Sequence, residues 1–194
     1  HLCDRRQRQM CIRDRHNPAR AISKLIIDIP ELTAREDHRG IVMATVVCVR
    51  IGEEAFGTNA GFGQLMLTIR AEFESELDAL DAEICARARA YARQDGITNV
   101  EVQYRDSFPE TRNTPDAVAA VRKARLECGL PEAHWDEPFR SSEDFGCYTK
   151  LTSGALFYIG CGTRHAKLHT REYDFNDEII EPAVDMMFRL AQDS

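Results

Sequence analysis

QLMLTIRAE, residues 64–72, alternates apolar and polar side chains without a break. In an extended chain, successive side chains point to opposite sides. One side carries Leu65, Leu67, Ile69 and Ala71, and the polar residues between them face the other way. This period of two predicts a strand with one apolar face and one polar face.

A helix is predicted directly after this strand, in SELDALDAEICARARAYARQDG, residues 75–96. Its apolar stripe has helical spacing and consists of Leu77, Leu80, Ile84, Ala88 and Tyr91. Ser75 with Asp78 resembles a capping box, and Gly96 is the expected stop. The next segment, NVEVQYR (99–105), alternates again and is predicted to be a strand.

Upstream, NPARAISKLIIDIPEL (17–32) has helical spacing with Pro18 in the first turn, and IVMATVVCVRIG (41–52) is a predicted strand. The order of elements is therefore α-β-β-α-β. A ferredoxin-like βαββαβ unit without its first strand has this order. The missing strand would fall where residues 1–15 now stand.

The second half of the chain is predicted to begin after the polar, proline-bearing linker at 107–115. Thr114–Pro115 opens a helix that runs to Gly129, SSEDFGCYTKL (141–151) is a short helix, and ALFYIG (155–160) is a short buried strand. A final helix starts near Pro182. Three helices around one strand indicate the C-terminal part of a larger α/β domain.

Composition excludes several classes of partner. The 194 residues carry a net charge of −7, but residues 1–15 hold five arginines and a local charge of +3, which leaves −10 for the rest. This basic arm has no aromatic residues to stack on bases, so we expect no nucleic-acid partner. It contains MCIRDR (10–15), which resembles translated library-adapter sequence, and we treat 1–15 as non-native.

No run of about 18 apolar residues is present, so no membrane span is expected. The seven cysteines form no CxxC pair. That usage is typical of reduced thiols and predicts a cytoplasmic protein.

His169 follows a glycine-rich turn in AKLHTREYDFNDEI, residues 166–179. It is either a metal ligand or an ordinary polar loop residue. His165 lies four residues earlier, a spacing that places two imidazoles on one face of a helix. Because this segment is predicted to be a loop, the spacing alone does not indicate a zinc site.

Three further positions have alternative interpretations. Arg70, on the polar face of its strand, is either a carboxylate clamp or a surface charge. In SSEDFG (141–146), Glu143 and Asp144 are either a metal or proton-transfer site or the acidic start of a helix. The pair Glu53–Glu54 is either a pair of catalytic carboxylates or a solvated surface pair, and its place at a turn between strands favours the solvated surface.

In combination, SSEDFG, ALFYIGCG (155–162) and KLHTREYDFNDE (167–178) resemble the C-terminal region of metal-dependent N-acyl-amino-acid amidohydrolases. This group includes hippurate hydrolases, aminoacylases and dinuclear-metal carboxypeptidases. The upstream run ending in TIRA and the long helix resemble the family's inserted lid, or dimerisation, domain, and HNPARAISKLI (16–26) resembles the start of its first helix.

The resemblance covers residues 16–194 and implies an α+β architecture in two parts. Residues 16–107 would form a ferredoxin-like lid domain that lacks its first strand. Residues 108–194 would form the C-terminal α/β portion of a zinc-peptidase-like catalytic domain.

The resemblance also implies roles for individual residues. His169 matches a histidine that binds one of two divalent cations per intact subunit, zinc or manganese, with cobalt also suited to imidazole. Arg70 matches the arginine that holds the substrate carboxylate, and Asn59 matches a substrate-binding asparagine, although here the text is NAGFG without the family's I-P. Ser142, Glu143 and Asp144 would line and support the cleft without ligating metal.

The family's other metal ligands and its glutamate general base have no match in this chain. We therefore expect a fragment, inactive by itself, of a hydrolase that cleaves the amide bond of N-acyl amino acids or small peptides and dimerises through its lid. The alternative is a non-catalytic ferredoxin-like binding or dimerisation module. The coding sequence upstream of residue 16 would separate the two, because only the enzyme needs a metal-binding motif there.

Overall fold

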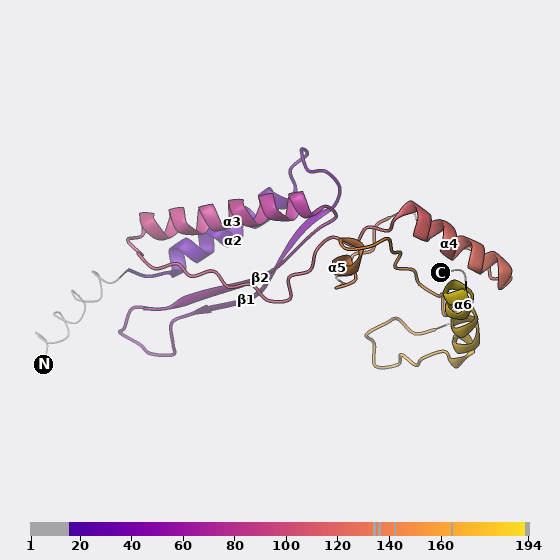
Figure 1. The fold of residues 1–194 in the computed structure, drawn as a ribbon. Coiled ribbons are helices and arrows are strands. Elements are labelled where there is room, and N and C mark those ends of the chain that lie inside the picture. Colours follow the sequence, from indigo (N-terminus) through magenta and orange to yellow (C-terminus); the bar gives the residue numbers. More distant parts are fainter. Residues whose placement is uncertain (1–15, 134, 136, 142, 164, 193–194) are drawn as a thin grey trace, which may run out of the picture. The chain divides into compact units, whose positions relative to one another are not determined.

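The computed structural model describes residues 16–133, 135, 137–141, 143–163 and 165–192. The chain forms two compact units, the first ending at Ser107 and the second beginning at Phe108. The fold is mixed α+β, as predicted, and its elements are labelled in Figure 1. Each unit is described by itself.

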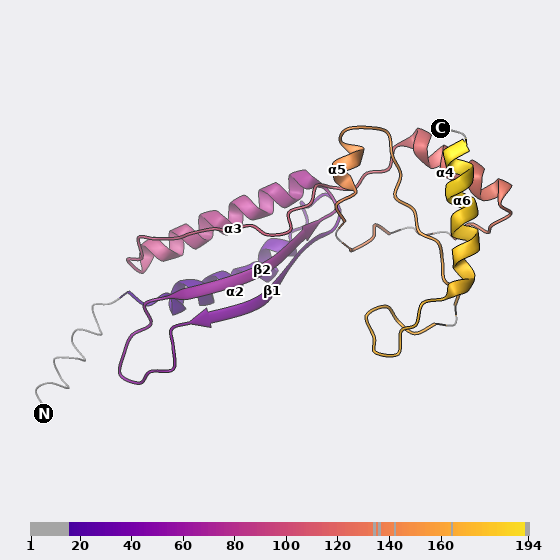
Figure 2. The same ribbon diagram turned by 60° about the horizontal axis from the view of Figure 1, so that its bottom comes forward.

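The described part of the first unit is a two-stranded antiparallel sheet with two helices on one face. β1 (Val42–Ile51) pairs with β2 (Gly63–Ala71), and Val42 lies opposite Ala71 at one end of the ladder. α2 (Ala19–Thr33) and α3 (Glu74–Gln94) pack against each other and against the strands. Figure 2 shows the long hairpin from a second side.

The core lies where the helices meet the sheet. Its buried side chains are Leu25, Leu32, Val42, Leu80 and Ile84. The alternate β2 residues Leu65, Leu67, Ile69 and Ala71 pack against them, which confirms the predicted apolar face of this strand. Burying one Leu, Ile or Val side chain stabilises a fold by about 1.5–3 kcal/mol, so this layer holds the helices on the sheet.

The sequence predicted the end of α3 correctly but not its N-terminal cap. The helix begins at Glu74 after the extended residue Phe73, with no side-chain cap, so the predicted capping box of Ser75 and Asp78 is wrong. Its end is as predicted. Gly96 has a φ of 73°, its N–H donates to the Arg93 carbonyl at 3.0 Å, and the Ile97 N–H donates to the Ala92 carbonyl at 2.8 Å.

The strand predicted at 99–105 is not formed. Tyr104 is 64% exposed, and its hydroxyl donates to Asp81 Oδ2 of α3 at 2.7 Å. This hydrogen bond raises the pKa of Tyr104. A strand requires a neighbour that takes up its backbone hydrogen bonds. Among the described residues, no backbone hydrogen bond joins residues 99–105 to β1 or β2, so this segment alternates but pairs with no strand.

A charged cluster joins the outer sides of α2 and α3. Asp28 accepts from Arg87 Nη1 at 2.8 Å and from the Tyr91 hydroxyl, and Arg87 Nε also donates to Glu83 at 2.8 Å. The Tyr91 and Arg87 hydrogen bonds hold the pKa of Asp28 below its usual value. The Asp28 side chain is only 16% exposed, so solvent screens this pair less than a surface pair.

His38 ties the loop after α2 to both helices. Its Nε2 lies 2.7 Å from the Leu32 carbonyl and its Nδ1 lies 2.9 Å from Glu76 Oε2. Both partners accept, so the arrangement favours the doubly protonated imidazolium. The Leu32 carbonyl, and then Glu76, raise the pKa of His38 above its usual value.

The described part of the second unit is built mainly from helices. These are α4 (Pro115–Glu127), the short α5 (Gly146–Thr149), the 3-10 turn η1 (Asp177–Ile179) and α6 (Ile180–Gln192). α4 begins at Thr114–Pro115 as predicted, and Gly129, with a φ of 66°, follows its end. α6 packs on α4 and begins two residues before the predicted Pro182.

Hydrogen bonds fasten the segment before α4 to residues 153–156. Asn113 donates to the Leu156 carbonyl at 2.9 Å and accepts from the Leu156 N–H at 2.8 Å. The Thr114 N–H donates to the Gly154 carbonyl at 2.9 Å. The strand predicted at 155–160 is not formed. The Asn113 side chain pairs with the backbone N–H and carbonyl of Leu156, as a neighbouring strand would, but it reaches no other residue of this segment.

Among the described residues, no helix is both long enough and apolar enough to cross a bilayer.

We predict that Asp28→Ala lowers the free energy of unfolding by about 1–3 kcal/mol, because it leaves Arg87 and Tyr91 without their half-buried acceptor. Asp37→Ala is the matched control, since the side chains of the Asp37–Arg35 pair are 65% and 51% exposed. The control should lower this free energy by clearly less, because solvent screens an exposed ion pair. Urea unfolding followed by circular dichroism measures both, and equal losses would contradict the prediction.

The His38 contacts predict a pH dependence. Because the folded-state pKa is raised, their stabilisation is fully present below the unfolded pKa of about 6.5 and is lost as the pH rises through the folded value. His38→Gln should therefore destabilise the protein by about 1–3 kcal/mol at pH 6 and by clearly less at pH 9. Thermal unfolding of both proteins at the two pH values measures this, and a pH-independent difference would count against it.

Candidate functional site

His169 lies at the tip of an exposed turn that its neighbours hold in shape. The Thr170 N–H and hydroxyl both contact the Lys167 carbonyl, at 3.1 and 2.7 Å. His169 itself has a φ of 65°, in the left-handed region. A non-glycine residue there is uncommon, although histidine is among the residues enriched in it. The turn therefore presents the imidazole to solvent at some backbone cost.

The described residues do not assemble a set of metal ligands around His169. His165 directs Nδ1 to the Ala166 carbonyl at 2.8 Å. No group of three or more His, Cys, Asp and Glu side chains suited to a metal occurs among the described residues. The chemistry of His169 fits one ligand position of a divalent cation, and the described part of the chain does not supply a complete site.

Arg70 lies near the end of β2, opposite Met43, and is exposed. The alternation that sends Ile69 and Ala71 into the core directs Arg70 to the face of the sheet away from the helices. The paired strand fixes the backbone position of Arg70, and a planar guanidinium suits recognition of a carboxylate. Its predicted role as a substrate clamp stays a prediction.

Asn59 lies in the loop before β2 and contacts the start of α2. Its Oδ1 accepts from Asn17 Nδ2 at 2.7 Å, while Asn17 Oδ1 accepts from the Ala19 N–H at 2.9 Å. Arg70 is seven residues beyond Gly63, the first residue of β2, which corresponds to about 23 Å of strand. Asn59 and Arg70 of one chain therefore do not meet on one small carboxylate.

The contact of Asn17 with Asn59 was not predicted from the sequence. The signal was present, because an asparagine before a proline at a helix start commonly accepts a backbone hydrogen bond. The same pair of asparagines fixes the hairpin loop against the helix.

The acidic segment before α5 is only partly described. Ser142 lies outside the described residues, whereas Glu143 and Asp144 are exposed and are separated from α5 by Phe145. The Asp144 carbonyl accepts from the Cys147 N–H at 2.9 Å, so the pair stands at the start of this turn. Glu53 and Glu54 are exposed, as predicted.

Gly146 fixes the position of α5. A Cβ atom at this residue would lie 2.6 Å from the Glu110 carbonyl oxygen and 2.7 Å from that of Pro109. Only glycine allows the backbone of α5 to approach so closely. The acidic pair is therefore held beside residues 109–110.

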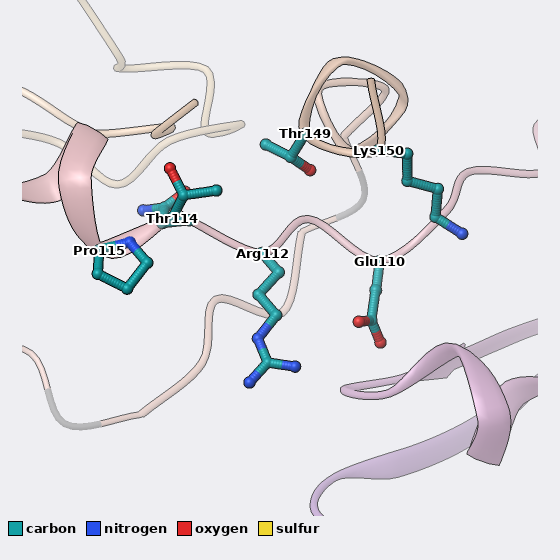
Figure 3. A pocket seen from close by; sticks show the side chains of 7 residues that line it. Glu110, Arg112, Thr114, Pro115, Thr149 and Lys150 are labelled. Carbon is teal, nitrogen blue, oxygen red and sulfur yellow. The ribbon is translucent and has the colours of Figure 1, made fainter. Parts of the chain in front are cut away.

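An open pocket of about 260 Å³ lies next to this contact (Figure 3). Its lining is Glu110, Arg112, Asn113, Thr114, Pro115, Thr149 and Lys150. The side chains of Arg112 and Lys150 extend in different directions in Figure 3 and do not converge on one point. None of the predicted site residues that the structure describes lines this pocket.

Comparison with known structures shows which fold this chain resembles. A crystal structure of a protein assigned as an aminohydrolase, from methicillin-resistant Staphylococcus aureus, matches 92% of this chain with a TM-score of 0.76 and 18% sequence identity. The match covers 46% of that chain. At this identity the likeness shows a shared fold alone, with a mixed α+β architecture.

The sequence defines the family. Residues 10–193 match the model of peptidase family M20/M25/M40, so the chain belongs to this family. It is also 27% identical over 133 residues to the uncharacterised hydrolase SH1513 of Staphylococcus haemolyticus strain JCSC1435, covering 66% of this chain and 34% of that protein. The chain thus spans between a third and a half of the relatives it matches. Members of the family are generally metal-dependent.

Proposed function

We propose that this chain is the lid and C-terminal part of a metal-dependent hydrolase that cleaves the amide bond of N-acyl amino acids or small peptides. The family match over residues 10–193 is the observation that carries the proposal. His169 supports it, because a non-glycine residue held in the left-handed region is often found at a functional site.

His169 would contribute an imidazole to one of two divalent cations, zinc or manganese, with cobalt as a third candidate. Such cations activate water and polarise an amide carbonyl. For the residues of this chain we propose roles in binding and positioning only. The described part of the chain supplies one candidate metal ligand, His169, and no group of three or more metal-binding side chains.

Arg70 would hold the substrate carboxylate through its planar guanidinium. Asn59 is a second predicted substrate contact, although a small substrate on Arg70 of the same chain would not reach it. Ser142, Glu143 and Asp144 would support the cleft, with Gly146 keeping their segment against residues 109–110. We further propose that the enzyme is a cytoplasmic homodimer that associates through residues 16–107.

The isolated 194-residue chain should not hydrolyse hippurate or an N-acetyl amino acid above the buffer rate, even with added zinc or manganese. The reason is that one imidazole cannot hold two cations and no general base is assigned in this chain. Product amino acid released over hours provides the measurement. Metal-dependent turnover that disappears in His169→Gly would refute this expectation.

In an enzyme completed by the upstream coding sequence, His169→Gly should lower bound metal by about one ion per subunit, with the rate falling in step. Glycine removes the imidazole and accepts the left-handed backbone, so the turn is retained. His165→Gly is the matched control, an exposed histidine four residues earlier, and should keep full stoichiometry. Metal analysis of the purified proteins decides, and unchanged metal content in His169→Gly would overturn the assignment.

A further inference from the structure

Three aromatic side chains of the second unit form one exposed stack. The centroid of the Phe139 ring lies 5.4 Å from that of Trp135 and 4.4 Å from that of Tyr158, with interplanar angles of 29° and 15°. Phe139 is therefore the middle ring. Trp135, Phe139 and Tyr158 are 67%, 55% and 54% exposed. We call these three residues the aromatic stack.

The stack joins two segments of the chain and leaves its end rings open. Trp135 and Phe139 belong to the loop after α4, whereas Tyr158 belongs to residues 155–160. Near-parallel, offset rings attract each other, so the stack holds these segments together. Within the described part of the chain, no further ring packs on Trp135 or Tyr158. Each end ring therefore has a face with no aromatic partner.

The position of the stack along the chain connects it with the proposed cleft. Phe139 lies four residues before Glu143, in the segment that leads into the acidic pair. Tyr158 lies in the segment that leads to the turn of His169. Both segments that the proposed function assigns to the cleft thus begin at the stack. Sites for small molecules are lined mainly by aromatic and other apolar side chains, with a few polar groups that fix orientation.

We propose that the aromatic stack is a subsite for an aromatic ring of the substrate, which stacks on the open face of Trp135. The ring belongs either to an aromatic acyl group or to the side chain of an aromatic amino acid, and both are recognised by the same chemistry. This inference rests on the proposed function, because it assigns the stack to substrates of the same hydrolase. It narrows those substrates to N-acyl amino acids or peptides that carry an aromatic ring.

Trp135 is the only tryptophan of the chain, so its fluorescence reports on the stack directly. The 194-residue chain is titrated with N-benzoylglycine, whose ring is on the acyl side, and with N-acetylphenylalanine, whose ring is on the amino-acid side. At least one of them should change the emission saturably in the millimolar range, and the tighter ligand identifies the source of the ring. N-acetylglycine and N-cyclohexanecarbonylglycine, whose ring is saturated and not planar, should bind at least fivefold more weakly.

Two variants separate a binding role from a structural one. Phe139→Leu removes the middle ring, keeps an apolar side chain and leaves Trp135 as the reporter, so it should weaken binding of the aromatic ligand at least fivefold. Phe188→Leu is the matched control, the same substitution at a phenylalanine of α6 that is 59% exposed and outside the stack, and it should bind normally. A stack that only joins two segments would show no ring-selective binding.

A flat titration, equal binding of the cyclohexane compound, or equal effects of the two variants would overturn the proposal. In the enzyme completed by the upstream coding sequence, Phe139→Leu should also lower kcat/KM for the aromatic substrate at least fivefold relative to N-acetylglycine, and an unchanged ratio would contradict it. The titration needs neither metal nor turnover. A completed enzyme that hydrolyses none of these compounds would therefore refute the proposed function, whereas the titration decides on the subsite.

Discussion

The apolar face of the β1–β2 hairpin is the constraint on which the first unit depends. A two-stranded hairpin is at best marginally stable in water, so its alternate leucines and isoleucines must be covered. α2 and α3 provide that cover through Leu25, Leu80 and Ile84. The same alternation places Arg70 on the uncovered face, so the position of a proposed substrate contact follows from the packing of its neighbours.

The two units are stabilised by different means. The first has a continuous apolar layer, reinforced at the helix surfaces by Asp28 and at the loop by His38. In the described part of the second, the buried apolar side chains are Ala124 and Met186. Hydrogen bonds from Asn113 and Thr114 supply much of its internal order. A unit with so small a core depends on additional burial for stability.

Local pattern was sufficient to predict the elements whose partners are close in sequence. The alternation of β2, the stripe of α3 and the glycine at its end follow from periodicity and backbone conformation. Residues 99–105 and 155–160 show the limit of this approach, because a strand exists only beside another strand and no short window of sequence contains that neighbour.

In the candidate site, too, residue identities could be predicted from the sequence, whereas their spatial arrangement could not. The family resemblance assigned His169 and Arg70, but the left-handed backbone of His169 depends on the turn around it. The separation of Asn59 from Arg70 depends on the length of the hairpin. Neither follows from residue identity alone. The Asn17–Asn59 contact joins residues 42 positions apart, and its signal in the sequence concerned only the start of a helix.

Gly146 limits which amino-acid substitutions this protein can accept. The two carbonyl oxygens that a side chain would meet belong to the backbone, so no substitution at positions 109 or 110 removes them. A missense change at Gly146 cannot be compensated by altering a neighbouring side chain. Among family members that keep this contact, position 146 should therefore accept no other amino acid, even where the residues around it diverge.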